Sequence, residues 1–154
     1  MKGNDAIINK LNDLLADELT AINQYMVHSE MCANWRYEHL HEAAEKRAIA
    51  EMKHAEKLIG RILFLEGSPT VSRLNTIRVG PDVPTQHEND RGAEADAIKS
   101  YNEGIRLAVE VGDNGTRDML EDILEDEEEH IDFLEAQLEQ IRQIGLPSYL
   151  VEQI

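Results

Sequence analysis

Two positions in this sequence pair a glutamate with a histidine three residues later: Glu51 with His54, and Glu127 with His130. In an α-helix of 3.6 residues per turn, this spacing places both side chains of a pair on one face. Carboxylate and imidazole groups are donors that suit iron, manganese or zinc. One such pair is weak support, because both residues are common on solvated faces. Two pairs in one chain predict a metal centre.

The two pairs belong to a longer internal repeat, in which residue types recur with an offset of 76 positions. The repeated residues are Glu18, Ile22, Tyr25, Glu51 and His54, which recur as Glu94, Ile98, Tyr101, Glu127 and His130. Self-similarity at a fixed offset predicts two related structural units. We therefore expect two helix pairs that a pseudo-two-fold axis brings together.

The spacing of apolar residues predicts four long helices that position these side chains. They are expected from Asn4 or Asp5 to about Asn34, from about Glu38 to Glu66, from Pro84 to Val111, and from about Thr116 to Ile144. Each has an inward stripe with steps of three and four residues, and polar ligand types interrupt each stripe near its middle. The second stripe also includes Arg47. Residues 148–154 are expected to form a short fifth helix or final turn.

Residues 67–82 have no helical pattern and are expected to be extended. Glycine and proline lie near both ends of the segment, and the apolar residues between them alternate. At ~3.3 Å per residue such a segment spans ~50 Å, whereas a helix of about 30 residues is ~45 Å long. The segment is therefore expected to cross the whole bundle, so that the third helix runs parallel to the second.

Composition supports an all-α protein with a single domain over residues 1–154. Only 9 glycines and 4 prolines interrupt the 154 residues. With 31 acidic and 15 basic residues, the formal net charge is −16, which argues against nucleic acid and anionic membranes as partners and favours cations. The chain has one cysteine, so an intrachain disulfide and a CxxC site are excluded. Cys32 is expected to be a buried, unreactive thiol.

The N-terminus lacks the apolar region of a signal peptide, and the longest aliphatic or aromatic run is too short to span a bilayer. We expect a cytoplasmic protein with no membrane partner.

Six residues that interrupt the four inward stripes outline a two-metal centre. They are Glu18, Glu51, His54, Glu94, Glu127 and His130. One glutamate from each of two helices, with Glu-x-x-His from each of the other two, is the known donor set of di-iron helical bundles. Glu51 and Glu127 are expected to bridge the metals, Glu18 and His54 to complete one position, and Glu94 and His130 the other. A buried ion-pair network without metal is disfavoured, because the inward set has four acids and few bases.

Tyr25 and Tyr101 lie two helical turns beyond Glu18 and Glu94. Each phenol is expected either to hydrogen-bond a metal ligand or to donate an electron, and the sequence leaves both roles open. Met52 points ~100° away from the metal-facing row, which favours an interface. A single thioether without a partner residue is not a cofactor signature, although two subunits that meet about a two-fold axis can offer two such sulfurs to one iron. The remaining histidines are expected at the surface: His28, His39, His41 and His87.

The sequence resembles the bacterioferritin family along nearly its whole length. The segments that carry the resemblance are ELTAINQY from Glu18, EMKHAE from Glu51, RILFLEG from Arg61 and DEEEHID from Asp126. The resemblance implies that the six residues form a ferroxidase centre and that Met52 from two subunits ligates haem b. It also implies a hollow shell of twenty-four subunits, built from two-fold dimers, that stores ferric mineral, and a ferredoxin that reduces the haem to release iron.

The chain departs from this family at two positions. Some bacterioferritins have His and Asp on the inner surface where this chain has Lys46 and Ala50. An additional iron site on the cavity side is therefore not expected. The sequence leaves open whether the centre holds its iron as a stable cofactor or passes it through, for instance by movement of His130.

The function expected from these observations is iron storage. Fe(II) is oxidised by O2 or peroxide at an intra-subunit di-iron centre, with two iron ions per subunit, and is deposited as ferric mineral. One alternative is a di-iron redox enzyme, such as a peroxidase or oxidase, without storage. The absence of a CxxC electron-transfer module and of a substrate-binding insertion argues against it. The other alternative is a metal-free helical assembly module.

Overall fold

The computed structural model describes residues 1–154 and consists of helices and their connections. The helices are α1 (Asp5–Asn34), α2 (Glu38–Phe64), α3 (Val83–Glu110), α4 (Asn114–Ile144) and α5 (Leu146–Val151). The all-α prediction is confirmed. Helix α2 ends before the predicted Glu66, and α3 begins one residue before Pro84. Proline is tolerated in the first turn of a helix because its missing N–H has no partner there.

Side-chain caps explain where three of the helices begin. The Asn4 side chain accepts a hydrogen bond from the Ala6 amide at 2.8 Å, as the sequence predicts. Asp82 caps α3 and Asp113 caps α4 in the same way. These oxygens satisfy amides that have no partner within the helix. Gly112, with φ of 74°, makes the turn between α3 and α4, a conformation that costs glycine little.

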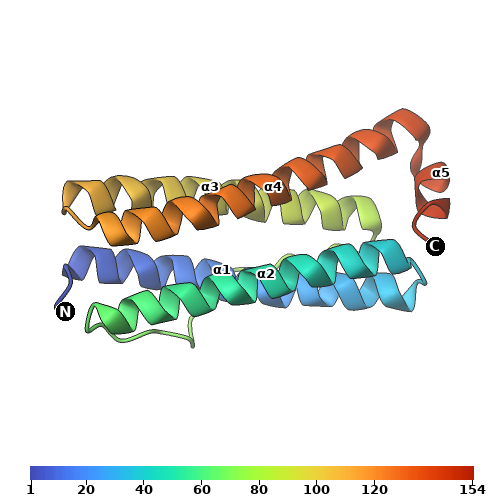
Figure 1. Cartoon of the computed structure of the whole chain (residues 1–154). Helices are drawn as coiled ribbons and strands as arrows, with labels where there is room; N and C mark the ends of the chain where they lie inside the picture. Colours follow the sequence, from blue (N-terminus) through green and yellow to red (C-terminus); the bar gives the residue numbers. More distant parts are fainter.

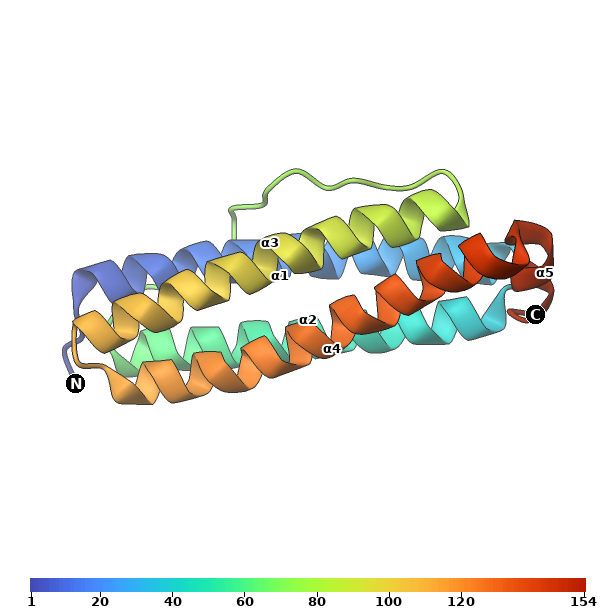
Figure 2. The same ribbon diagram turned by 90° about the horizontal axis from the view of Figure 1, so that it is seen from above.

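The four long helices pack as two hairpins, α1 with α2 and α3 with α4 (Figure 1). Helices α2 and α3 run in the same direction, because the segment between them returns along the length of the bundle before α3 begins. We call this extended segment, residues 67–82, the strap. Figure 2 shows it along the outside of α1 and α3. The predicted crossover is thereby confirmed. Helix α5 lies across the end of the bundle at which α4 ends.

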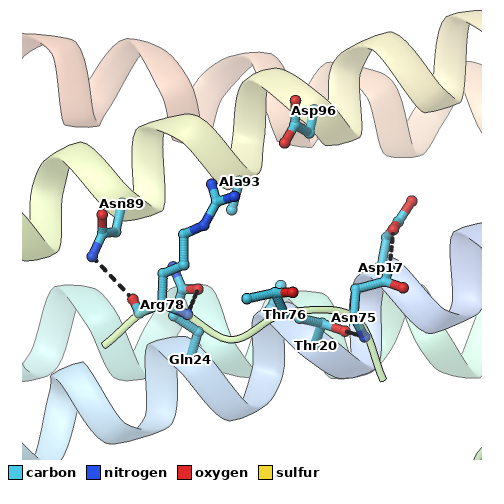
Figure 3. Close-up of a pocket in the computed structure, with 10 residues that line it drawn as sticks. Asp17, Thr20, Gln24, Asn75, Thr76, Arg78, Asn89, Ala93 and Asp96 are labelled. Atoms are coloured by element: carbon cyan, nitrogen blue, oxygen red, sulfur yellow. Dashed lines mark hydrogen bonds between the residues drawn. The ribbon is translucent and has the colours of Figure 1, made fainter. Parts of the chain in front are cut away.

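The strap is held by side chains of α1 that lie four residues apart and accept its amides. The Thr20 hydroxyl accepts from the Asn75 N–H at 2.8 Å, Gln24 from Arg78 at 3.0 Å, and His28 from Gly80 at 2.9 Å. Figure 3 shows the first two contacts, at the floor of a polar cavity of about 270 Å³ between α1, α3 and the strap. Three amides of an extended segment without strand partners are thus satisfied.

Apolar residues from all four long helices form one core. Its largest aliphatic members are Ile7, Leu11, Leu14, Leu15, Leu58, Ile62, Leu65, Leu120 and Ile123. A smaller cluster at the α5 end contains Cys32 and Tyr149. Cys32 is buried, as predicted, and burial raises the pKa of its thiol to about 11. No helix is both long enough and apolar enough to cross a bilayer.

Beside this core lies a buried polar group that we call the Asp90 cluster: Asp90, Gln24, His28 and Arg47. The Asp90 carboxylate accepts from the Gln24 amide at 2.8 Å and from His28 Nδ1 at 2.8 Å. Its second oxygen accepts from the Arg47 guanidinium at 2.9 Å. Both oxygens of Asp90 are therefore occupied, by groups from α1 and α2, while His28 Nε2 also anchors the strap.

The surface prediction is wrong for two histidines. His28 and His87 are buried, whereas His39 is exposed and His41 is half-buried. The reason is that their partners lie on other elements: Asp90 and Gly80 for His28, and the Tyr149 hydroxyl, 3.0 Å from Nε2, for His87. Spacing along a single helix does not reveal such partners.

Candidate metal centre

The six residues that the sequence singles out converge in the middle of the bundle. Donor atoms of Glu18, Glu51, His54 and Glu127 all lie within 4.8 Å of one another, as do those of Glu51, Glu94, Glu127 and His130. Two residues, Glu51 and Glu127, belong to both groups. This sharing is the geometry expected of bridging carboxylates between two metal positions. The role of the six residues as ligands stays a prediction.

Each long helix supplies its part of the centre from the face that also builds the core. Glu18 follows Leu11 and Leu15 along the buried face of α1, and Glu51 and His54 precede Leu58 on α2. Five of the six residues are at most 2% exposed. His130 is the exception, with 15% of its side chain exposed. The centre is therefore dry on the α1 and α3 side and approachable beside His130.

The two histidines contact the bridging carboxylates through the same ring nitrogen. His54 Nδ1 lies 2.9 Å from Glu51 Oε2 and 2.9 Å from Glu127 Oε1. His130 Nδ1 lies 3.0 Å from Glu51 Oε1. Both rings therefore present Nδ1 to the centre, where it would serve as the metal ligand.

Asp126 is a residue of the site that the sequence analysis missed. One of its carboxylate oxygens lies 2.9 Å from Nε2 of His54. A carboxylate on the outer nitrogen of a metal-binding histidine fixes the tautomer and the ring orientation. Asp126 precedes Glu127 in an acidic run that reads mainly as solvated surface, and the contact bridges 72 residues. No signal along the chain marks it.

The two tyrosines bind the centre crosswise. The Tyr25 hydroxyl of α1 donates to Glu94 Oε1 of α3 at 2.7 Å. The Tyr101 hydroxyl of α3 donates to Glu18 of α1. Burial, with the nearby carboxylate charge, raises the pKa of both phenols well above the usual value, so both keep their protons. The hydrogen-bonding role is thus present, and the redox role of Tyr25 stays a prediction.

Without a metal, the charges of the centre are balanced by protons, because two of its carboxyl groups and both of its histidines have raised pKa values. Burial raises the pKa of Glu18 well above its usual value and the pKa of Glu127 to about 12. Burial acts against a charge on His130, but contacts with Glu51 and Glu94 raise its pKa to about 9. Four buried ligand atoms make no hydrogen bond of good geometry: Glu51 Oε1, Glu94 Oε2, Glu127 Oε1 and His130 Nδ1. Three of them take part in the carboxylate–histidine contacts given above, and Glu94 Oε2 has no polar contact. Such hard or borderline donors fit divalent cations.

Two features lie outside the centre. Met52 lies on the outer side of α2 and is 44% exposed, as predicted. Met26 on α1 has a similar exposure of 49%. Its role as a haem ligand stays a prediction. Lys46 and Ala50 line a cavity of about 460 Å³ together with His130. These two side chains offer no carboxylate or imidazole for a further iron site.

The comparisons with known proteins agree with this geometry. The chain matches the ferritin-like domain family over residues 8–144. It is 40% identical to a bacterioferritin of Brucella melitensis over 149 residues, which is 97% of this chain and 92% of that protein. A bacterioferritin of Mycobacterium tuberculosis is also 40% identical, over 97% of this chain and 94% of the relative. A bacterioferritin of Rhodobacter capsulatus is 40% identical over 94% of this chain and 90% of the relative. The chain therefore belongs to the ferritin family and, within it, to the bacterioferritins.

Proposed function

We propose that this protein is an iron-storage ferroxidase. It oxidises Fe(II) at the six-residue centre and deposits ferric mineral inside an oligomeric shell. The observation that carries the proposal is the pair of ligand groups that share Glu51 and Glu127 within 4.8 Å, in a chain that belongs to the bacterioferritins. The relatives with 40% identity carry the name bacterioferritin.

In this proposal each subunit binds two Fe(II) ions as substrate. Glu18 and His54 complete one position, and Glu94 and His130 the other. Each Fe(II) gives one electron to a shared O2 or peroxide. The four carboxylates offset the cationic charge, and the tyrosine hydroxyls orient Glu18 and Glu94 from behind. Asp126 holds the His54 ring so that Nδ1 faces the metal.

A metal-free assembly module is the weaker reading of the same geometry. It requires the six side chains to satisfy one another, whereas Glu94 Oε2 has no polar contact and three further ligand atoms have only carboxylate–histidine contacts without good hydrogen-bond geometry. Unsatisfied buried polar atoms are costly, so a cation is the simpler completion of the centre.

The quaternary and cofactor parts of the proposal rest on the bacterioferritin family. We infer a homo-oligomer of twenty-four subunits built from two-fold dimers, in the cytoplasm, with haem b held between the Met52 side chains of two subunits. A bacterioferritin-associated ferredoxin would reduce the haem to release iron. Exposed apolar side chains on α1 and α2, Met26, Ile49 and Met52, support a face that is covered by a second copy.

Aerobic Fe(II) loading of the metal-free protein, followed by size exclusion and iron analysis of the assembly peak, tests the function. Storage predicts far more iron per subunit than the two ions of one centre. Two irons per subunit and no more would instead favour the di-iron peroxidase or oxidase without storage. A protein that retains no iron would favour the metal-free module.

Replacement of Met52 by leucine tests the haem assignment. We expect the Met52→Leu protein to lose the haem absorption bands while it still oxidises Fe(II), because Met52 does not face the centre. Met26→Leu, the same change at a similarly exposed position on α1, is the matched control and should retain haem. Normal haem content in Met52→Leu would refute the ligand role.

A further inference from the structure

The contacts immediately around the centre obey the internal repeat. Tyr25 donates to Glu94, and Tyr101, which lies 76 positions later, donates to Glu18. The two candidate metal positions are therefore equivalent in their ligands and in the phenols behind them. Any difference between the positions must come from residues further out.

Behind Glu94 lies a buried positive charge. Arg47 NH1 is 4.0 Å from Glu94 Oε1, and the guanidinium stacks 4.6 Å from the centre of the Tyr25 ring. Its NH2 group pairs with Asp90 at 2.9 Å. Nε and NH1 of Arg47 have no hydrogen-bond partner. One guanidinium thus fixes the phenol that orients Glu94 and also offsets part of the charge of this carboxylate.

The other half of the centre has no such charge. The position equivalent to Arg47 is Ile123, and the position equivalent to Asp90 is Leu14. Both are fully buried members of the hydrophobic core. No guanidinium therefore lies against Glu18, whereas one lies 4.0 Å from Glu94.

The histidines differ in the same direction. His54 is held on both sides, by Glu51 at Nδ1 and by Asp126 at Nε2. The ion-pair contacts of His130 all use Nδ1. The position equivalent to Asp126 is Ala50, which has no polar group and lines the cavity beside His130. His54 is thus pre-oriented for a metal, and His130 is not.

We propose that the two metal positions are unequal, and that Arg47 is the positioning residue that weakens the one at Glu94 and His130. The first cation binds at Glu18 and His54, where no guanidinium faces the carboxylate and the imidazole is fixed. The second binds next to the guanidinium, whose positive charge repels it. This inference rests on the proposed function, because it takes the six residues as ligands of two metal ions.

Titration of the metal-free protein with Co²⁺, followed by visible absorption and by equilibrium dialysis, tests the inequality without any redox reaction. We expect two steps of one ion per subunit each, with the second weaker by about tenfold or more, the usual scale for outer-shell changes. Two ions bound with equal affinity would overturn the inequality and leave the proposed function standing. No binding of Co²⁺ would overturn both.

A matched pair of variants assigns the steps to positions. Glu18→Gln should abolish the tight step, and Glu94→Gln, its equivalent in the repeat, should abolish the weak step. Loss of the tight step in Glu94→Gln would reverse the proposed order and overturn it.

Replacement of Arg47 by the residue at its equivalent position tests the cause. Arg47→Ile should tighten the second Co²⁺-binding step several-fold and leave the first unchanged. Arg47→Lys keeps the positive charge, so most of the difference in affinity between the two steps should remain. Arg61→Ile is the control: Arg61 lies on α2 like Arg47 but pairs with Asp113, the N-cap of α4, and its loss should move neither step. An unchanged second step in folded Arg47→Ile would refute the role of Arg47.

Ala50→Asp tests the histidine half of the argument and does not disturb the Asp90 ion pair, so it serves if Arg47→Ile does not fold. The new carboxylate copies Asp126 and should hold Nε2 of His130. We expect a tighter second step with the total still at two ions per subunit. A second step as weak as in the unmodified protein would contradict the inference.

Discussion

Two buried polar clusters lie side by side in this bundle, and they differ in whether the chain itself provides hydrogen bonds for their carboxylate oxygens. In the Asp90 cluster, both carboxylate oxygens accept hydrogen bonds and the charge is paired with Arg47. In the metal centre, four carboxyl groups face two histidines, and the oxygens Glu51 Oε1, Glu94 Oε2 and Glu127 Oε1 make no hydrogen bond of good geometry. A carboxylate whose oxygens are satisfied stabilises the fold by itself, whereas the unsatisfied oxygens of the centre fit a cation.

The largest expected effect is at a bridging ligand. Glu127→Gln should slow Fe(II) oxidation by about a hundredfold or more, the upper scale of changes around a metal. The metal-free protein should keep its stability, because burial raises the pKa of Glu127 to about 12 and the side chain is already neutral at pH 7. Stopped-flow absorbance of Fe(III) measures the rate, and thermal unfolding measures the stability. Unchanged oxidation would show that the unsatisfied cluster is not the reaction site.

The opposite result is expected in the Asp90 cluster. Asp90→Ala leaves Arg47 as a buried charge without its closest ion-pair partner, so the free energy of unfolding should fall by about 3–5 kcal/mol. The Co²⁺ stoichiometry of the folded protein should remain two. Urea unfolding of the metal-free protein measures the loss. Asp96→Ala, an exposed carboxylate on the same helix, is the control and should change stability by less than about 0.5 kcal/mol. Equal losses in both variants would remove the contrast between the clusters.

The sequence predicts the features that depend on spacing along one helix, and it does not predict contacts between helices. The helices, the strap and the convergence of the six residues follow from periodicity along each helix and from the internal repeat. Contacts such as Arg47 with Asp90 and His54 with Asp126 join residues that are 43 and 72 positions apart. They depend on the axial register of two packed helices, and no spacing within one helix encodes this register. For this reason the buried positions of His28 and His87 and the role of Asp126 were not predictable.

His87 is a further buried polar group, and its hydrogen-bond partner is the Tyr149 hydroxyl. Its burial and the neighbouring Arg47 charge lower its pKa from 6.5 to about 4. Since the unfolded chain takes up the proton at a higher pH than the folded chain, stability is lost as pH falls from about 6.5 to about 4, by ~3 kcal/mol. Urea unfolding at several pH values measures this slope. His87→Gln should flatten it, and an unchanged slope would assign the acid sensitivity to other groups.

The smallest expected effect concerns one anchor of the strap. Thr20→Val keeps the shape of the side chain but removes the hydroxyl that accepts the Asn75 N–H, so stability should fall by about 1 kcal/mol. Hydrogen exchange should quicken at the Asn75 amide and stay slow at Gly80, which His28 still holds. Thr76→Val, at an exposed position of the strap, is the control. If the Asn75 amide stays protected in Thr20→Val, Gln24 and His28 are sufficient to position the strap. The three side chains would then not hold the strap independently of one another.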